Sequence, residues 1–88
     1  MEEWEFINSL VLSVKERYIN PLRLKLGDDE LLQKFIDLTI RTLETHGFRV
    51  LNVTEFNDYG GKYTIIVLEK FKIVIDNANF LEEFMVLF

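Results

Sequence analysis

The stretch NDYGGKYTIIVLEKFKIVID, residues 57–76, decides the fold of this 88-residue chain. It begins with Asn, Asp and two glycines between apolar segments, which is typical of a β-hairpin loop because glycine adopts positive φ angles without steric cost. Residues 48–56, which precede it, are rich in β-branched and aromatic side chains and predict a strand. The stretch therefore predicts a hairpin that has Asp58 in its turn.

Residues 62–76, beyond that turn, carry apolar side chains on both alternating sets of positions. They form either one long bent strand or two strands that reverse direction near residues 69–72. We favour the reversal, because a strand of about fifteen residues is unusual in a small domain, although no Gly, Asn or Pro marks the turn. Such a reversal places Glu69 opposite Lys72 as a favourable cross-strand pair.

Two helices are predicted before the sheet. Residues 3–19 carry apolar side chains at spacings of three and four, which predicts an amphipathic helix that ends at Pro21. A second apolar stripe of helical period fills residues 28–46. Asp28 is expected to cap the first amides of this helix, and Gly47 is expected to end it in the left-handed conformation.

Two connecting or terminal segments allow more than one structure. The segment PLRLKLG, residues 21–27, fits a short edge strand, an extended linker or one helical turn begun by the proline, and we favour the extended connection. Near the end of the chain, Asn79 and Glu82 have capping-box spacing, and apolar residues follow at helical intervals. We predict a short helix there, although residues 80–88 also permit a strand.

Together these elements predict one compact domain, residues 1–88, of the α+β class. An N-terminal two-helix layer packs on a small antiparallel β-meander, with a short C-terminal helix or strand. The absence of Cys excludes disulfides, thiolate metal sites and Cys nucleophiles. The bias toward Ile, Leu, Glu and Lys, without Cys, is typical of a thermophilic source.

The composition also limits where the protein works. The opening residues, MEEWEF, are acidic and lack the basic region of a signal peptide. The longest apolar run, Phe84–Phe88, is far shorter than the ~20 residues that span a bilayer. We therefore expect a cytoplasmic protein that does not bind membranes.

Two carboxylates, Asp58 and Glu69, are the candidates for chemistry. In a metal-dependent nuclease-like hydrolase, two such groups hold Mg²⁺ while a lysine orients the attacking water. The available lysines, Lys70 and Lys72, follow Glu69 by one and three residues, so in a strand they point to the opposite face. His46, the only histidine, is an ordinary residue of a helix C-terminus. We therefore expect no enzyme, no catalytic residues, no metal and no cofactor.

Nucleic-acid binding is the second alternative. The net charge of −5 disfavours sequence-independent binding to a phosphate backbone. Residues 15–25 are nevertheless basic, and Tyr18 among them offers a stacking surface. The candidate residues for this function are Lys15, Arg17, Arg23 and Lys25.

A surplus of apolar side chains is the strongest positive signal, because 49% of the residues are hydrophobic. One two-helix layer covers only one face of a sheet, so either the terminal element or a partner covers the other. We expect a small non-enzymatic protein–protein interaction module, a homodimer or an accessory subunit of a larger complex. Aromatic residues and Met are enriched in interface cores, and the candidate interface residues are Phe6, Leu12, Phe80, Phe84, Met85 and Phe88.

Overall fold

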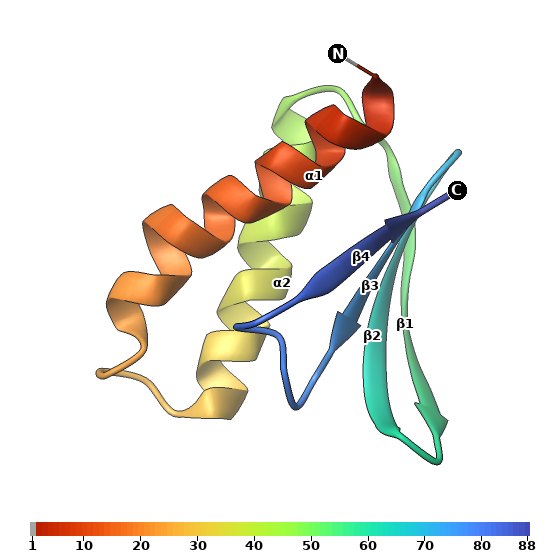
Figure 1. Ribbon diagram of the computed structural model, residues 1–88. Helices are drawn as coiled ribbons and strands as arrows, with labels where there is room; N and C mark the ends of the chain where they lie inside the picture. Colours follow the sequence, from red (N-terminus) through yellow and green to blue (C-terminus); the bar gives the residue numbers. More distant parts are fainter. Residues whose placement is uncertain (1) are drawn as a thin grey trace.

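The computed structural model describes residues 2–88, which form two layers (Figure 1). The helices α1 (Glu3–Val14) and α2 (Asp28–Thr45) lie on one face of a four-stranded sheet. The strands are β1 (Val50–Asp58), β2 (Gly61–Leu68), β3 (Lys72–Asp76) and β4 (Phe84–Leu87). They follow one another in the order β1-β2-β3-β4, and every neighbouring pair is antiparallel. The predicted α+β class, with its two-helix layer and meander, is confirmed.

The first helix runs through residues 3–19 as predicted, but its last part is not α-helical. A π-helical turn, Lys15–Ile19, follows α1, and a 3₁₀ turn, Asn20–Leu22, follows that. A π turn makes i→i+5 hydrogen bonds and holds more residues per turn than an α-helix, so Ile19, five residues after Val14, is buried with it. Tyr18, which the α-helical spacing placed on the apolar stripe, is 51% exposed.

The connection between the helices is a compact turn, so the favoured extended linker is wrong. Pro21 lies in the 3₁₀ turn, near whose start its missing N–H group is not needed. The amides of Lys25 and Leu26 donate to the Leu22 carbonyl, at 3.0 and 3.1 Å. Leu22 and Leu26 pack against the core, whereas Leu24 between them is fully exposed. The alternation of leucines therefore reflects a turn rather than a strand.

The ends of α2 match the prediction at one end only. Gly27 occupies the N-cap position, and no side chain caps the helix, so the expected capping by Asp28 is wrong. Asp28 is instead the first residue of the helix, where the helix dipole favours a negative charge. At the other end Gly47 adopts a φ of +88°, the left-handed conformation that was expected.

The β1–β2 hairpin closes as predicted. Asp58 pairs with Gly61, which leaves Tyr59 and Gly60 as the loop. The Asp58 carboxylate accepts a hydrogen bond of 2.7 Å from the Gly60 amide. This bond fixes the turn, so Asp58 is used locally.

The chain reverses again between β2 and β3, which confirms the predicted reversal. The Leu68 amide donates to the Phe71 carbonyl, at 2.8 Å, and closes the turn. The predicted pair of Glu69 with Lys72 is wrong, because Lys72 pairs with Val67 and Glu69 lies within the turn itself. The turn forms without Gly, Asn or Pro because the flanking strands are held together by the sheet.

The C-terminal segment is a strand, so the predicted short helix is wrong. The capping-box pattern produces only one turn, in which the amides of Glu82 and Glu83 donate to the Asn79 carbonyl. The chain then extends, and β4 pairs with the free edge of β3. Phe84 and Val86 lie on the side of β4 that packs against the core. Strand pairing therefore outweighs the helical spacing of the apolar residues.

The core lies between the two layers. It joins residues of α1, the π turn and α2 with the inward side chains of β2 and β3. Phe35 of α2 is fully buried and stacks on Phe80, with 6.1 Å between ring centroids. The fully buried aliphatic side chains of the core are Ile7, Val11, Val14, Ile19, Leu31, Leu43, Ile66, Ile73 and Ile75.

Candidate interaction surface

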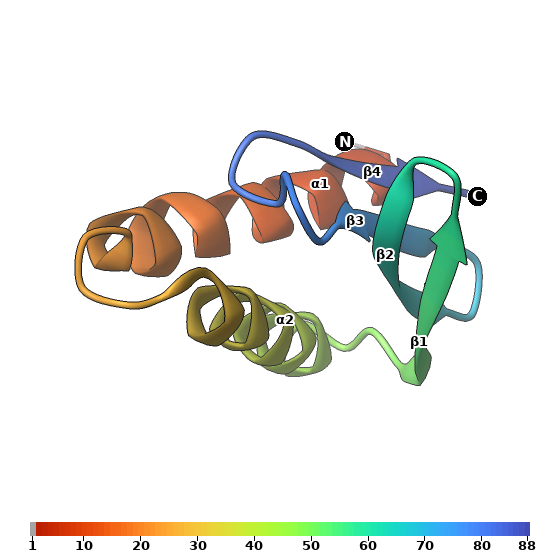
Figure 2. The same cartoon turned by 90° about the horizontal axis from the view of Figure 1, so that it is seen from below.

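The sheet has one covered face and one open face. In β2, the side chains of Thr64, Ile66 and Leu68 are buried toward the helices, and the residues between them point the other way. Both helices lie on the same side of the sheet in two perpendicular views (Figures 1 and 2). β4 extends the sheet and does not fold over it, so no helix or strand among residues 2–88 covers the second face. We call it the outer face.

The strand register defines the outer face as three rows of side chains. The central row crosses all four strands and is apolar apart from one Thr. The row toward the β2–β3 turn and the row toward the β1–β2 loop flank it. The central row consists of Thr54, Ile65, Val74 and Met85. The row toward the β2–β3 turn consists of Asn52, Val67, Lys72 and Leu87, and the row toward the β1–β2 loop consists of Phe56, Tyr63 and Asp76.

Large apolar side chains of the outer face are accessible to solvent. Phe56 is 52% exposed, Met85 is 56% exposed and Leu87 is 40% exposed. Because the register makes these residues neighbours of Ile65, Val67 and Val74, they form one patch rather than scattered exposed positions. A contiguous apolar patch on a small domain is a candidate interaction surface.

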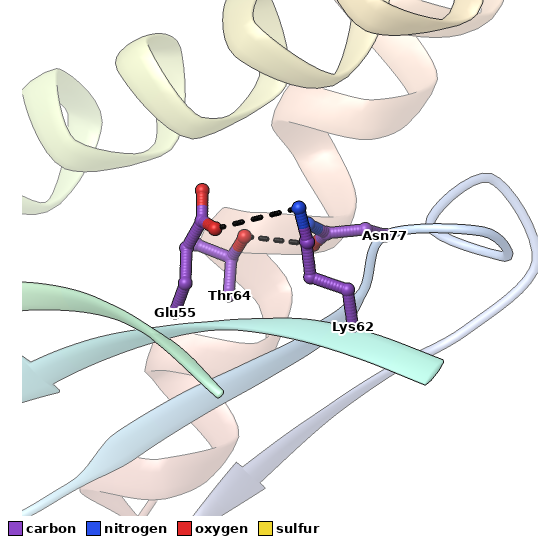
Figure 3. A network of polar contacts seen from close by, with 4 residues as sticks. All are labelled: Glu55, Lys62, Thr64 and Asn77. Atoms are coloured by element: carbon purple, nitrogen blue, oxygen red, sulfur yellow. Dashed lines mark hydrogen bonds and ion pairs between the residues drawn. The ribbon is translucent and has the colours of Figure 1, made fainter. Parts of the chain in front are cut away.

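The opposite side of the β1–β2 hairpin is polar. Lys62 and Glu55 form an ion pair of 3.8 Å on the helix side of the sheet (Figure 3). Nearby, the Thr64 hydroxyl donates a hydrogen bond of 2.7 Å to the Asn77 side-chain oxygen. At this end of the hairpin, polar side chains thus lie on the helix side and an apolar side chain, Phe56, lies on the outer face. A two-layer domain whose second sheet face is solvated has the opposite arrangement.

The two ends of the outer face carry opposite charges. Near the β1–β2 loop, the Asp58 carboxylate, partial burial, and then Asp76 and Glu83 raise the pKa of Tyr63 above its ordinary value. This end is therefore acidic. At the other end of β3, Lys72 has no ion pair within the described residues 2–88. The adjacent β2–β3 turn carries Glu69 and Lys70, so the charge of this end is positive overall.

The six predicted interface residues do not form one surface. Met85 lies on the outer face, whereas Phe88 follows β4 and is 82% exposed, with its ring centroid 5.2 Å from that of Phe71. Phe80 is 3% exposed in the core, so it is not available for contact with a partner. The remaining three lie elsewhere: Phe84 on the covered face of β4, Phe6 against His46 and Phe48, and Leu12, 38% exposed, on α1.

Sequence reasoning missed most of the outer face. The alternation that carries Tyr63, Ile65 and Val67 was visible, but its meaning depended on which alternate set faced the helices. Phe56 was assigned only to a strand, and Leu87 was assigned to a helix. The strand register brings these residues into one patch, and this register is not evident from the sequence alone.

The basic segment is divided by the fold. Lys15 is 7% exposed, and its ammonium group lies 5.7 Å from the centroid of the Phe84 ring, so it is not available to a phosphate backbone. Arg17 and Tyr18 line a groove of about 420 Å³ between α1 and α2, together with Arg41 and His46. Arg23 and Lys25 are exposed in the turn between the helices.

The proposed pair of metal-binding carboxylates is separated by a whole strand. Asp58 precedes β2 and Glu69 follows it. Eight residues of strand at about 3.3 Å each place the two carboxylates more than about 20 Å apart, whereas ligands of one Mg²⁺ lie about 2 Å from it. The two residues therefore cannot share a cation. No cluster of three metal-binding side chains occurs within residues 2–88.

No protein-family model, curated protein sequence or solved structure matches this chain. Neither α1 nor α2, nor any other helix among residues 2–88, combines the length and the apolar character that a bilayer crossing requires.

Proposed function

We propose that this protein is a small non-enzymatic protein–protein interaction module that binds through the outer face of its sheet. The observation that carries the proposal is the exposure of large apolar side chains on the outer face, together with the polar helix side at the loop end of the β1–β2 hairpin. The ion pair of Lys62 with Glu55 lies on the helix side, while Phe56, Met85 and Leu87 are exposed on the other. A second protein surface that covers the outer face removes these side chains from water.

The exposure of these residues sets the strength of binding that we expect. Burying a large apolar side chain completely contributes about 1.5–3 kcal/mol, so three residues that are about half exposed contribute roughly 2–4 kcal/mol together. A micromolar complex requires about 8 kcal/mol, after the costs of association have been met. The half-buried residues of the central row must therefore contribute as well, and we expect a moderate, reversible complex.

Site-specific photo-crosslinking tests the proposal. Benzoylphenylalanine is placed at Met85 on the outer face or, as the matched control, at Leu24, which is fully exposed in the turn between the helices. Each protein is irradiated in purified form and in nuclease-treated lysate of its source. We expect a discrete protein adduct from position 85 that unlabelled protein competes away, and none from position 24.

Substitution of Ile65 by Glu in the Met85 crosslinking variant completes the test. Ile65 is central to the outer face and its side chain does not enter the core, so the fold is expected to survive and circular dichroism verifies it. We expect the adduct to be lost. The proposal is wrong when position 85 gives no adduct in either sample, or when the adduct persists in a folded Ile65→Glu protein.

Nucleic-acid binding is a second candidate function, supported by the groove between α1 and α2. Its walls bring Arg17 and Arg41 together with Tyr18, and acidic residues are absent from its lining. We expect single-stranded oligonucleotide binding that weakens steeply between about 50 and 200 mM salt and is lost in Arg17→Glu. Lys34→Glu, an equal charge change on the exposed face of α2 outside the groove, is the control. Equal loss in both variants would leave only a nonspecific charge effect.

A further inference from the structure

The charges of the outer face point to the identity of its partner. Lys72, Val74 and Asp76 lie at alternate positions of β3, so all three point to the outer face. Lys72 lies at one end of this face, and Asp76 lies at the end where Asp58 and Glu83 gather around Tyr63. The face therefore runs from a basic end, across an apolar middle, to an acidic end.

We propose that the partner is a second copy of this chain, packed face to face about a two-fold axis that crosses the strands at Val74; this inference rests on the proposed function of the outer face. The axis lies between the two sheets and reverses the strand direction of one relative to the other. The central row of each copy then meets the same row of its partner. The Lys72 row meets the row that contains Asp76, so two oppositely charged pairs form at each dimer contact.

Electrostatics selects this arrangement over the other symmetric one. A two-fold axis parallel to the strands would place the Lys72 ends of both copies at the same level and the acidic ends together. Like charges at corresponding levels of an interface are unfavourable, whereas complementary ends fix both register and partner choice. An isologous contact of this kind requires a self-complementary patch, and the outer face has that property only in the antiparallel orientation.

The size of the outer face fits a small dimer interface. A standard interface covers about 800 Å² on each partner, and weak, transient interfaces cover less than about 600 Å², which is about a tenth of the 5870 Å² accessible here. Four strands about 4.8 Å apart and five residues long span about 19 by 17 Å, roughly 320 Å² before side-chain relief is counted, so the outer face fits a weak dimer. Leu51 and Phe88, 50% and 82% exposed at the rim, add to this area. Two sheets packed about 10 Å apart leave Lys72 within reach of the facing Asp76.

A charge exchange measured by sedimentation equilibrium tests the inference. We expect the dissociation constant of the wild-type dimer to lie below roughly 500 µM. In the Lys72→Glu dimer, the new carboxylate of each copy would face Asp76 of the other, and in the Asp76→Lys dimer two lysines would face each other at both contacts. We expect this repulsion to weaken the dimer at least about tenfold in each variant. The double variant restores both pairs with their signs exchanged, and we expect its dissociation constant to return to within about threefold of wild type.

Two controls separate the charge effect from other causes. Lys34→Glu makes the same change in net charge on the exposed face of α2 and is expected to leave the dimer unchanged. Asp76 also accepts a hydrogen bond of 3.0 Å from the Ala78 amide, so Asp76→Lys perturbs a turn as well as a charge. Asp76→Asn keeps an acceptor oxygen and loses only the charge, and we expect it to weaken the dimer by a smaller factor.

The outcomes distinguish this inference from the proposed function. A wild-type protein that remains monomeric up to roughly 500 µM overturns the inference, and a crosslink from Met85 to a different protein would then leave the proposed function standing. A dimer that the double variant fails to restore, or that Lys34→Glu weakens equally, overturns the antiparallel register. A monomeric protein without any crosslink from Met85 overturns both.

Discussion

Replacing Thr39 by Val is expected to stabilise the protein. Thr39 lies on the buried face of α2, 1% exposed, one turn from Phe35 and one turn from Leu43. Its hydroxyl has no hydrogen-bond partner within the described residues 2–88. The folded state therefore removes a polar group from water and supplies no bond in return.

The magnitude follows from the chemistry of the exchange. A buried hydroxyl without a partner costs about 1–3 kcal/mol, and Val has nearly the shape and the helix propensity of Thr. We expect Thr39→Val to raise the free energy of unfolding by about 1–2 kcal/mol. In a domain of this size each kcal/mol raises Tm by about 4–8 °C.

Urea and thermal unfolding followed by circular dichroism measure this gain. Thr45→Val is the matched control, because it makes the same substitution on the same helix. Unlike Thr39, Thr45 is exposed, and its hydroxyl donates a hydrogen bond of 2.8 Å to the Arg41 carbonyl. We expect the control to unfold at or slightly below the wild-type midpoint. A Thr39→Val protein less stable than wild type would refute the reasoning, since its hydroxyl would then bond to the Phe35 carbonyl or to a buried water.

Three further substitutions test the core, a helix end and the acidic end of the outer face. Phe35→Ala removes a fully buried ring and should lower the free energy of unfolding by about 3–5 kcal/mol, out of about 4–13 kcal/mol for a domain of this length. Leu24→Ala, at a fully exposed site, should leave the same urea titration unchanged. Equal losses of stability in the two variants would contradict the core assignment. Gly47→Ala forces a Cβ onto a residue with a φ of +88° and should lower the unfolding free energy by about 1 kcal/mol; an unchanged midpoint would mean that the turn relaxes. Because the pKa of Tyr63 is raised, its contribution to stability is complete below the unfolded tyrosine pKa of about 10 and is lost as pH rises through the higher folded value. Ultraviolet titration of the wild-type protein should show a tyrosine transition above the ordinary tyrosine pKa, and Tyr63→Phe should remove it.

The helices and hairpins were predictable because their signals are local. Gly61 and Gly47 adopt positive φ angles that few other residues tolerate, and the stripe of residues 28–46 needs only one helix to be recognised. The segments that failed depend on distant partners. Residues 80–88 have helical spacing, but the unpaired edge of β3 was the stronger influence, and that edge exists only after the sheet has formed.

The interaction surface was less predictable than the fold. The sequence suggested an uncovered sheet face, because two helices cover only one side, yet of the six residues selected from the first helix and the chain end only Met85 lies on that face. Phe80 was chosen for its type and is in the core, whereas Val74 was not chosen and lies at the centre of the outer face. Lys15 was counted as a surface cation, but it follows Val14 into the π turn and lies under Phe84. Burial of this kind depends on tertiary packing, which composition and spacing do not encode.

The meander has a consequence for how the chain folds. Every strand pairs with the strand next to it in sequence, so no pairing requires the closure of a long loop, and the entropic barrier of non-local sheets is avoided. Hairpins form in about 1–10 μs, and the sheet can grow from β1–β2 by one strand at a time. β4 joins last, and Phe84 and Val86 then close the core beside α1. β4 must therefore emerge from the ribosome before the domain can complete its core, and until then the free edge of β3 is open to the strands of other chains.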